Sequence, residues 1–351
     1  MRELAFYKGK KVLITGHTGF KGAYLSRILL LAGADVTGYA LDPPTDPSLF
    51  ALMKLSSDMR SVKGDVRDFD HLDSVVREVR PDVVFHLAAQ PIVRESYRIP
   101  RETFEINVMG TVNLLEALRR AEGVLSVVNV TTDKVYFNRE DGRAYREDEP
   151  LNGYDPYSNS KSCSDLATQS YRSSFFEEAG IPVSTARAGN VIGGGDFAKD
   201  RLVPDAVRAC LKGEPVALRN PSSVRPWQHV LEPLSAYLLL AEKQAADPTL
   251  AGAWNVGPAP EDMVPTQRIA ELFTEAWGSG ASVTFTPDDG PHEASLLMLD
   301  SAKLRETLGW KSRMNIAEAV RASAVWSKEV LRDGADARAV SDRQIRAYFE
   351  R

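Results

Sequence analysis

The stretch KVLITGHTGFKG, residues 11–22, decides the fold class. It starts with a short apolar, β-branched run, which predicts a buried strand, and it ends with glycines spaced Gly-x-x-Gly-x-x-Gly. Such glycines let the backbone approach a diphosphate closely and let the strand pack tightly on the following helix. The helix expected over residues 20–33 would add unpaired N–H groups and a positive potential at its first turn. The spacing alone is weak evidence, because many strand-to-helix turns use glycine only for their shape.

The same unit, a short apolar run followed by an amphipathic helix, recurs along the first half of the chain. The pattern predicts strands at residues 11–15, 35–40, 62–64, 82–86, 125–130 and 182–186. It predicts helices at residues 20–33, 69–79, 100–121 and 156–180. Alternation of this kind predicts an α/β fold of the Rossmann type, with a doubly wound parallel sheet and helices on both of its faces.

Beyond residue 188 the sequence changes character, because glycines cluster at 193–195, prolines recur and the elements become shorter. Helices are predicted there at residues 201–212, 233–245, 266–277 and 316–331. A length of 351 residues fits about two domains of about 150 residues each. We therefore expect a dinucleotide-binding domain over residues 1–188, with part of 227–257 returning to it. A smaller C-terminal substrate-binding domain is expected mainly over residues 189–351.

Composition argues against several classes of protein. The chain is 43% hydrophobic and 26% charged, as ordinary globular proteins are, and its net charge of −5 argues against a nucleic-acid partner. Cys163 and Cys210 are too few for a disulfide framework or a four-ligand zinc site, so we expect no metal and two buried thiols. The charged start of the chain and the lack of a long apolar run predict no targeting segment, no membrane partner and a cytoplasmic location.

Residues that bear chemistry follow the expected fifth strand and open the long helix after it. The helix carries Tyr157-Ser158-Asn159-Ser160-Lys161, and a spacing of four places the phenol and the ammonium on one face. A lysine beside a phenol favours the phenolate and lowers its pKa from about 10, which makes the tyrosine a usable base. By itself the pair is common on exposed helix faces. It gains weight because Thr131-Thr132-Asp133-Lys134 ends the strand, where parallel sheets place ligands.

The glycine loop, the strand-end hydroxyl and the Tyr-x-x-x-Lys pair, in that order and spacing, resemble the extended short-chain dehydrogenase/reductase superfamily. Within it, Thr132-Asp133-Lys134 resembles the Thr-Asp-Lys set of the CDP-glucose 4,6-dehydratase family, whereas other nucleotide-sugar 4,6-dehydratases usually carry Thr-Asp-Glu. Further runs resemble that family: GHTGFKG at 16–22, YALDPPTDPSLF at 39–50, HLAAQPIV at 86–93, NVMGTVNLL at 107–115, AGNVIGGGD at 188–196, DRLVPD at 200–205 and RPWQHVLEP at 225–233. The resemblance covers nearly the whole chain.

The resemblance implies a lyase that converts CDP-D-glucose to CDP-4-dehydro-6-deoxy-D-glucose and water with tightly held NAD. Tyr157 would remove the proton of the 4-hydroxyl while hydride leaves C4, Lys161 would lower the pKa of Tyr157, and Thr132 would orient O4. Asp133 would protonate the departing 6-hydroxyl, and Lys134 would remove the C5 proton before hydride returns to C6. Lys134 acts as a base only when it is neutral. The alternative is an inert ion pair between Lys134 and Asp133.

The resemblance also implies which residues bind the cofactor and the substrate. For NAD these are Gly16, His17, Thr18, Gly19, Phe20, Lys21, Gly22, Asp65, Val66, Leu87, Ala88 and Ala89, with Tyr157 and Lys161. For the sugar nucleotide they are Gln90, Asn107, Asn190, Arg201, Arg219, Arg225 and His292. Asp65 would accept from the adenine amino group, unless it only caps the following helix. The acidic slot after the second strand, which favours NAD, holds Ala40, with Asp42 two residues later.

Three other functions stay open. A nucleotide-sugar 4-epimerase on the same scaffold also needs Tyr157 and Lys161, but it has no use for an acid at 133 and a base at 134. A 4,6-dehydratase for another nucleoside diphosphate hexose fits the same motifs, because the sequence does not identify the base. A non-catalytic dinucleotide-sensing module is a remote alternative, since such modules tend to lose the tyrosine or the lysine.

The resemblance has two further implications. One is a homodimer or homotetramer that pairs the long helices at 100–121 and 156–180 across a two-fold axis. The other is a role in deoxysugar synthesis for a lipopolysaccharide O-antigen.

Overall fold

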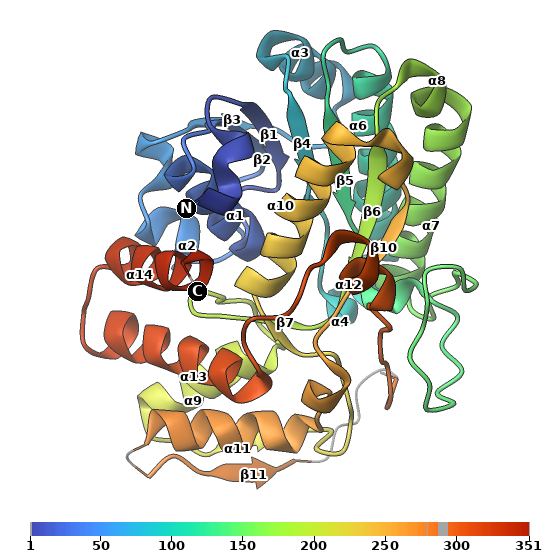
Figure 1. The fold of residues 1–351 in the computed structure, drawn as a ribbon. Helices are drawn as coiled ribbons and strands as arrows, with labels where there is room; N and C mark the ends of the chain where they lie inside the picture. Colours follow the sequence, from blue (N-terminus) through green and yellow to red (C-terminus); the bar gives the residue numbers. More distant parts are fainter. Residues whose placement is uncertain (1, 279, 287–293, 351) are drawn as a thin grey trace.

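A seven-stranded parallel sheet lies at the centre of the fold (Figure 1). The computed structural model describes residues 2–278, 280–286 and 294–350. The strands run in the order β10-β6-β5-β4-β1-β2-β3, and every neighbouring pair is parallel. They are β1 (Lys11–Thr15), β2 (Asp35–Ala40), β3 (Arg60–Lys63), β4 (Val83–His86), β5 (Ser126–Val130), β6 (Val183–Ala188) and β10 (Ala253–Val256). The predicted α/β fold with a Rossmann-type parallel sheet is therefore confirmed.

Both faces of the sheet are buried, because the side chains of β1 alternate between two apolar cores. Val12 and Ile14 belong to one core, and Leu13 between them belongs to the other. The first core lies beneath α1 (Phe20–Leu31) and α10 (Leu231–Ala246). The second lies beneath α3 (Phe69–Val79) and α6 (Gly110–Arg119), beside α7 (Pro156–Tyr171). Two covered faces are what a parallel sheet requires.

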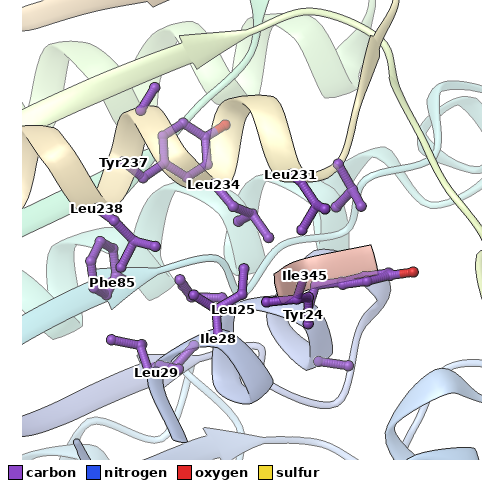
Figure 2. Close-up of a cluster of buried hydrophobic side chains, with 14 of the residues drawn as sticks. Tyr24, Leu25, Ile28, Leu29, Phe85, Leu231, Leu234, Tyr237, Leu238 and Ile345 are labelled. Atoms are coloured by element: carbon purple, nitrogen blue, oxygen red, sulfur yellow. The ribbon is translucent and has the colours of Figure 1, made fainter. Parts of the chain in front are cut away.

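Helix α14 (Ala337–Phe349), close to the end of the chain, completes the first core. Figure 2 shows side chains of α1 facing those of α10, with one side chain each from β4 and α14 beside them. The labelled residues are Tyr24, Leu25, Ile28, Leu29, Phe85, Leu231, Leu234, Tyr237, Leu238 and Ile345. The sequence pattern did not indicate α14, because its large apolar residues are few and irregularly spaced. Packing against the core therefore stabilises this helix more than its own sequence does.

A second, smaller layer lies below the sheet in Figure 1. Its core is built from α9 (Leu202–Lys212), α11 (Thr266–Trp277) and α13 (Ile316–Ser327). Two short parallel pairs belong to it, namely β7 (Val191–Ile192) with β9 (Gln228–His229), and β8 (Val216–Leu218) with β11 (Val283–Phe285). The remaining α-helical segments outside the long helices are α2 (Leu49–Leu52), α4 (Val93–Arg98) and α12 (Ala302–Leu308). Among the described residues, no helix has both the length and the apolar character that crossing a membrane requires.

The two longest predicted helices each contain a π-helical turn. The first consists of α5 (Pro100–Phe104), a π turn at Glu105–Met109 and α6. The second consists of α7, a π turn at Arg172–Phe176 and α8 (Glu177–Ala179). A π turn changes the hydrogen-bonding step from four residues to five, which an apolar periodicity does not reveal.

A buried ion pair ties α7 to β6 beneath the carboxyl end of the sheet. Arg187 donates from Nε to Oδ2 of Asp165 at 2.8 Å and from its second terminal nitrogen to Oδ1 at 2.9 Å. The Thr131 hydroxyl also donates to Asp165 Oδ2, at 3.1 Å, and Arg187 reaches the Tyr136 hydroxyl at 2.9 Å. Both charged side chains are almost completely buried. The pair therefore joins β5, β6 and α7 through paired polar groups.

Removing one partner of this pair is expected to cost much more stability than removing both. Arg187→Met leaves the Asp165 carboxylate buried without its partner, which costs about 3–5 kcal/mol, whereas Arg187→Met with Asp165→Leu removes both charges and costs less. Urea unfolding measures the difference. Arg268→Met is the control, because its partners Glu271 and Glu275 are exposed and such pairs are worth about 0–1 kcal/mol. Equal losses in the single and double variants would contradict this expectation.

Candidate active site

A cavity of about 280 Å³ lies at the carboxyl ends of β5 and β6, between the start of α1 and α9. Open α/β sheets bind their ligands at this edge. The sheet side of the cavity is lined by Lys21, Thr131, Thr132, Lys134 and Tyr157. The second layer contributes Asn190, Asp196, Asp200, Arg201, Arg219, Arg225 and Trp227. A second cavity of about 110 Å³ shares Val93, Lys134 and Arg225 with the first, so Lys134 borders both.

The glycine loop between β1 and α1 has a shape that side chains would destroy. Gly16 has φ +79°, and a Cβ built there would lie 2.7 Å from the backbone nitrogen of Ala88. A Cβ on Gly22 would lie 2.2 Å from the carbonyl oxygen of Gly16. Gly19 is the N-cap of α1, and a Cβ there would make only an ordinary contact. The loop therefore leaves bare backbone N–H groups at a helix start, which fits the diphosphate of a dinucleotide.

The other residues predicted to hold the cofactor lie in this loop or in the segments that follow β3 and β4. His17 shares a hydrogen bond with the Ser61 hydroxyl at 2.7 Å, and Thr18 donates to the carbonyl of Leu41 at 3.0 Å. Leu87, Ala88 and Ala89 follow β4, where the Leu87 N–H donates to Thr15 at 3.0 Å. Val66 is buried against Gly110. Phe20 opens α1.

Asp65 follows β3 and does not cap the next helix, because Asp68 is the N-cap of α3. The Asp65 carboxylate accepts from Arg67 Nε and from the Arg67 backbone, and this contact lowers the pKa of Asp65. At the end of β2, where Ala40 occupies the acidic slot, Asp42 forms an exposed ion pair with Lys63.

Thr132, Asp133 and Lys134 form a tight turn directly after β5. Thr132 is its N-cap and donates to Asp133 Oδ1 at 2.9 Å. Lys134 Nζ lies 3.2 Å from the same oxygen and 3.3 Å from Asn190 Oδ1. Asp133 is fully buried and does not line the cavity, and its Oδ2 has no hydrogen-bond partner among the described residues. The acid and the base that the sequence predicted are therefore in contact, but only Lys134 faces the cavity.

Tyr157 and Lys161 lie on the first turns of α7, whose start is fixed by the Asp155 N-cap. Burial raises the pKa of Tyr157 to about 12, and the opposing effect of the Thr132 hydroxyl, which hydrogen-bonds to the phenol, is smaller. The direction is opposite to the expected one. Lys161 donates to the Val130 carbonyl at 2.9 Å. Its own pKa is lowered to about 7 by burial and by the charge of Lys21.

Four of the predicted substrate residues line the cavity, and the three arginines among them each contact an oxygen. Arg201 pairs with Asp196 at 3.4 Å, and Arg219 pairs with Asp200 at 3.3 Å. Arg225 is buried and donates to the Val224 carbonyl at 3.0 Å. The fourth is Asn190, which holds Lys134. Guanidinium groups at these places suit a diphosphate.

The remaining predicted substrate residues lie elsewhere. Asn107, in the first π turn, accepts from the Gln90 backbone N–H at 2.8 Å and donates to the Ser160 hydroxyl at 2.9 Å. The Gln90 side chain donates to the Thr103 hydroxyl at 3.0 Å. Neither Gln90 nor Asn107 lines the cavity. His292 lies outside the described residues.

Several cavity residues escaped the sequence analysis, although signals for some of them were present. Asp196 and Trp227 stand inside runs that carry the family resemblance, and Arg94 follows another such run directly. The carboxylates of Asp196 and Asp200 were not predicted to line the cavity, because binding of a diphosphate suggests cationic residues. Among the described residues, no group of three or more His, Cys, Asp or Glu is placed to hold a metal ion.

Comparison with known proteins identifies the family of the chain. The family profile described as GDP-mannose 4,6 dehydratase matches residues 13–323. The chain belongs to this dehydratase family. CDP-glucose 4,6-dehydratase of Salmonella typhimurium (strain LT2) is 47% identical over 350 residues, which cover 98% of this chain and 97% of that protein.

More distant relatives share the fold and most of the length. The dTDP-glucose 4,6-dehydratase of Streptomyces griseus is 30% identical and covers 90% of this chain and 93% of its own length. Among solved structures, the UDP-glucose 4-epimerase of Thermus thermophilus in complex with NAD is 27% identical, with a TM-score of 0.78. That match covers 90% of this chain and 98% of the epimerase.

The buried Lys161 is expected to destabilise the folded chain below about pH 10. Its pKa falls from 10.5 to about 7 on folding, so the unfolded chain binds more protons between these values and stability rises with pH there. We expect Lys161→Met to raise the thermal midpoint by a few degrees at about pH 7 and by little near pH 10. Lys212→Met, at the exposed end of α9, is the control. If the thermal midpoints of wild type and Lys161→Met differ by the same amount at every pH, this explanation is excluded.

Proposed function

We propose that this chain is an NAD-dependent CDP-glucose 4,6-dehydratase, which converts CDP-D-glucose to CDP-4-dehydro-6-deoxy-D-glucose and water. The observation that carries the proposal is the contact of the buried Asp133 with Lys134, which lines one cavity together with Tyr157. An acid and a base next to a tyrosine suit elimination of water next to a ketone. The 47% identity to a CDP-glucose 4,6-dehydratase over almost the full chain supports the choice of nucleotide.

The residues present fit a dinucleotide. The glycine loop would hold its diphosphate, because Gly16 and Gly22 have no room for side chains and α1 starts there. Lys161 is buried at the carboxyl end of β5, where it would face the ribose of the nicotinamide. NAD, when bound, takes hydride from C4 of the sugar and later returns it to C6.

Tyr157 and Thr132 would act at C4. The Tyr157 phenolate takes the proton of the 4-hydroxyl, and the Thr132 hydroxyl, which contacts the phenol, orients O4. The charge of Arg201 favours the phenolate, and Lys161, one helical turn along α7, would do so when it is protonated. The ketone formed at C4 acidifies the C5 proton, so that a moderate base can remove it.

Lys134 and Asp133 would act at C5 and C6. Their 3.2 Å contact allows one shared proton to sit on either partner, as an ion pair or as a neutral amine beside a carboxylic acid. In the neutral form Lys134 accepts the C5 proton, and the proton of Asp133, which does not reach the cavity, passes to the departing 6-hydroxyl through Lys134. The two hypotheses for Lys134, base and ion pair, thus describe two positions of one proton.

The diphosphate of the substrate would contact Arg201, Arg219 and Arg225. The ion pair of Arg219 with Asp200 is partly exposed, so exchanging that carboxylate for a phosphate costs little, whereas the Asp196 partner of Arg201 is only 6% exposed. A bidentate phosphate contact is stronger than either of these pairs. Asn190 would hold a sugar or phosphate oxygen next to Lys134.

A nucleotide-sugar 4-epimerase is the second candidate, favoured by the structural similarity to one. Incubation with CDP-, dTDP-, GDP- and UDP-hexoses, followed by the alkali-induced absorbance of 4-keto sugars, tests both functions. A keto product from CDP-glucose is expected. A C4 epimer without ketone would contradict the proposal, and a keto product from another nucleotide only would correct the substrate.

Lys134→Ala is expected to stop elimination while leaving C4 oxidation in place, because Tyr157 and Thr132 remain. Adding substrate should then produce reduced cofactor, seen by its absorbance, and C5 hydrogen exchange with deuterated solvent should fall about a hundredfold or more. Lys134→Glu should recover part of the exchange, since a carboxylate is also a base. Lys212→Ala is the matched control. Exchange at the wild-type rate in Lys134→Ala would show that another group removes the C5 proton.

We also propose that the protein is a homodimer or homotetramer in the cytoplasm, in a pathway to O-antigen deoxysugars. Large apolar side chains are exposed on segments that α7 brings together, namely Tyr97 on α4, Met109 in the first π turn and Leu166 on α7 itself. Phe175 in the second π turn is exposed as well. Apolar side chains along long helices suit an isologous interface.

Leu166→Glu is expected to dissociate this assembly, because it places a charge in the apolar centre of the interface. Light scattering at micromolar concentration should change from a dimer or tetramer to a lighter species. Leu211→Glu on α9 is the matched control, since Leu211 has a similar exposure but lies on the second layer. A wild-type monomer at that concentration would remove the proposal.

A further inference from the structure

The proposed reaction leaves one proton on the wrong residue after each turnover, and the inference drawn from this rests on that proposed function. Tyr157 takes the proton of the 4-hydroxyl, and the departing water takes a proton from the Asp133–Lys134 pair. The C5 proton goes to Lys134 and returns to C5 when C6 is reduced. At the end Tyr157 therefore holds one proton too many, and the pair holds one too few.

The Thr132 hydroxyl lies between the group with the extra proton and the pair that lacks it. It is in hydrogen-bonding contact with the Tyr157 phenol, and it donates to Asp133 Oδ1 at 2.9 Å. Asp133 Oδ1 in turn lies 3.2 Å from Lys134 Nζ. One unbroken series of polar contacts thus runs from the phenol to the amine.

Asp133 has no direct access to solvent or to the cavity. Its side chain is fully buried, and it is absent from the lining of both cavities. The neighbouring hydroxyl of Thr131 is engaged elsewhere, because it donates to Asp165 at 3.1 Å. Among the described residues, the side chains that hydrogen-bond to the Asp133 carboxylate are Thr132 and Lys134. A proton that reaches Asp133 must therefore arrive from one of these two.

We propose that the Thr132 hydroxyl returns the proton of the 4-hydroxyl from Tyr157 to the Asp133–Lys134 pair at the end of each turnover. The O–H bond of Tyr157 breaks as its proton binds Thr132 Oγ1. The original O–H bond of Thr132 breaks as that proton binds Asp133 Oδ1, and Lys134 takes it from there. Nothing is oxidised or reduced, Thr132 ends unchanged, and Tyr157 is again a phenolate.

The energetics allow this transfer, although they do not favour it strongly. The transfer creates the ion pair of Asp133 with Lys134, in which opposite charges lie in contact. Burial raises the pKa of Tyr157 to about 12, which opposes loss of the proton to the pair as well as to water. The hydrogen bond from Thr132 and the charge of Arg201 favour the phenolate. The end state is the Asp133–Lys134 ion pair that the structure contains.

Thr132→Val tests the transfer through the ratio of two rates. Rapid quenching gives the rate of the first turnover on CDP-glucose, which starts from correctly protonated residues, and the steady state adds the return of the proton. We expect the ratio of first-turnover to steady-state rate to rise at least tenfold over wild type, and Thr132→Ser to restore it. Imidazole should raise the steady-state rate of Thr132→Val, because a small buffer can take the extra proton from Tyr157 at the cavity and give one to the partly exposed Lys134.

Thr131→Val is the matched control, since it removes a neighbouring hydroxyl that is not in the series, and its ratio should equal that of wild type even where loss of the hydrogen bond to Asp165 lowers both rates. An unchanged ratio in Thr132→Val overturns the proposal even if both rates fall, because the hydroxyl then only orients O4. Thr132→Ala gives the same comparison if the valine variant does not fold. Failure of the proposed function appears differently, since wild type itself then forms no keto product from CDP-glucose.

Discussion

The ion pair between Arg187 and Asp165 is the constraint on which the site depends. Asp165 stands four residues after Lys161, which stands four after Tyr157, so one face of α7 carries carboxylate, ammonium and phenol. Asp165 binds Arg187 on β6 and Thr131 at the end of β5. The turn that carries Thr132, Asp133 and Lys134 is therefore held at a fixed position along α7. The Lys161 contact with the Val130 carbonyl and the Ser162 contact with the Val135 carbonyl join α7 to β5 and to the turn as well, but the Asp165 pair alone among these carries opposite charges.

A second buried network connects α7 to β1, β4 and α6. The hydroxyl of Thr15 on β1 contacts His86 on β4 at 2.6 Å, and His86 contacts Thr111 on α6 at 3.1 Å. Thr111 shares a hydrogen bond with Ser164 on α7 at 2.8 Å. Burial lowers the pKa of His86 to about 3, so the ring is neutral and serves as a connector. Polar groups that are all paired in this way fix one arrangement of helices and strands, whereas apolar contacts alone tolerate sliding.

Much of this architecture could be predicted because the signals are local. Strands β1 and β2 and helices α3 and α11 begin and end where apolar periodicity and turn residues place them. The glycine loop, the run Thr132-Asp133-Lys134 and the spacing of Tyr157 and Lys161 are local signals of the same kind. Other features depend on tertiary contacts that periodicity does not contain. Asn107 is an example, because its amide turns inward to the Gln90 backbone.

The direction of the Tyr157 pKa could not be predicted for a related reason. The motif places a lysine one helical turn from the phenol, which suggests that charge controls the phenol. Burial of the hydroxyl is the larger effect in the structure, and it acts in the opposite direction. Likewise, the sequence shows that Asp133 precedes Lys134, but not that Asp133 is fully buried behind it. Charge is visible in a sequence, whereas solvent access is a property of the fold.

The burial of Asp133 gives a physical reason for a lysine at 134. An isolated carboxylate with one oxygen lacking any partner costs several kcal/mol when it is removed from water. A carboxylate at 134 would add a second negative charge next to it and raise that cost further. Lys134 removes the problem, because a carboxylate and an ammonium that share one proton carry no net charge in either position of the proton. The pair can therefore be buried with its acid hidden and its base at the cavity. Stability and chemistry then make the same demand on residue 134, namely a group that is basic yet neutralises its neighbour.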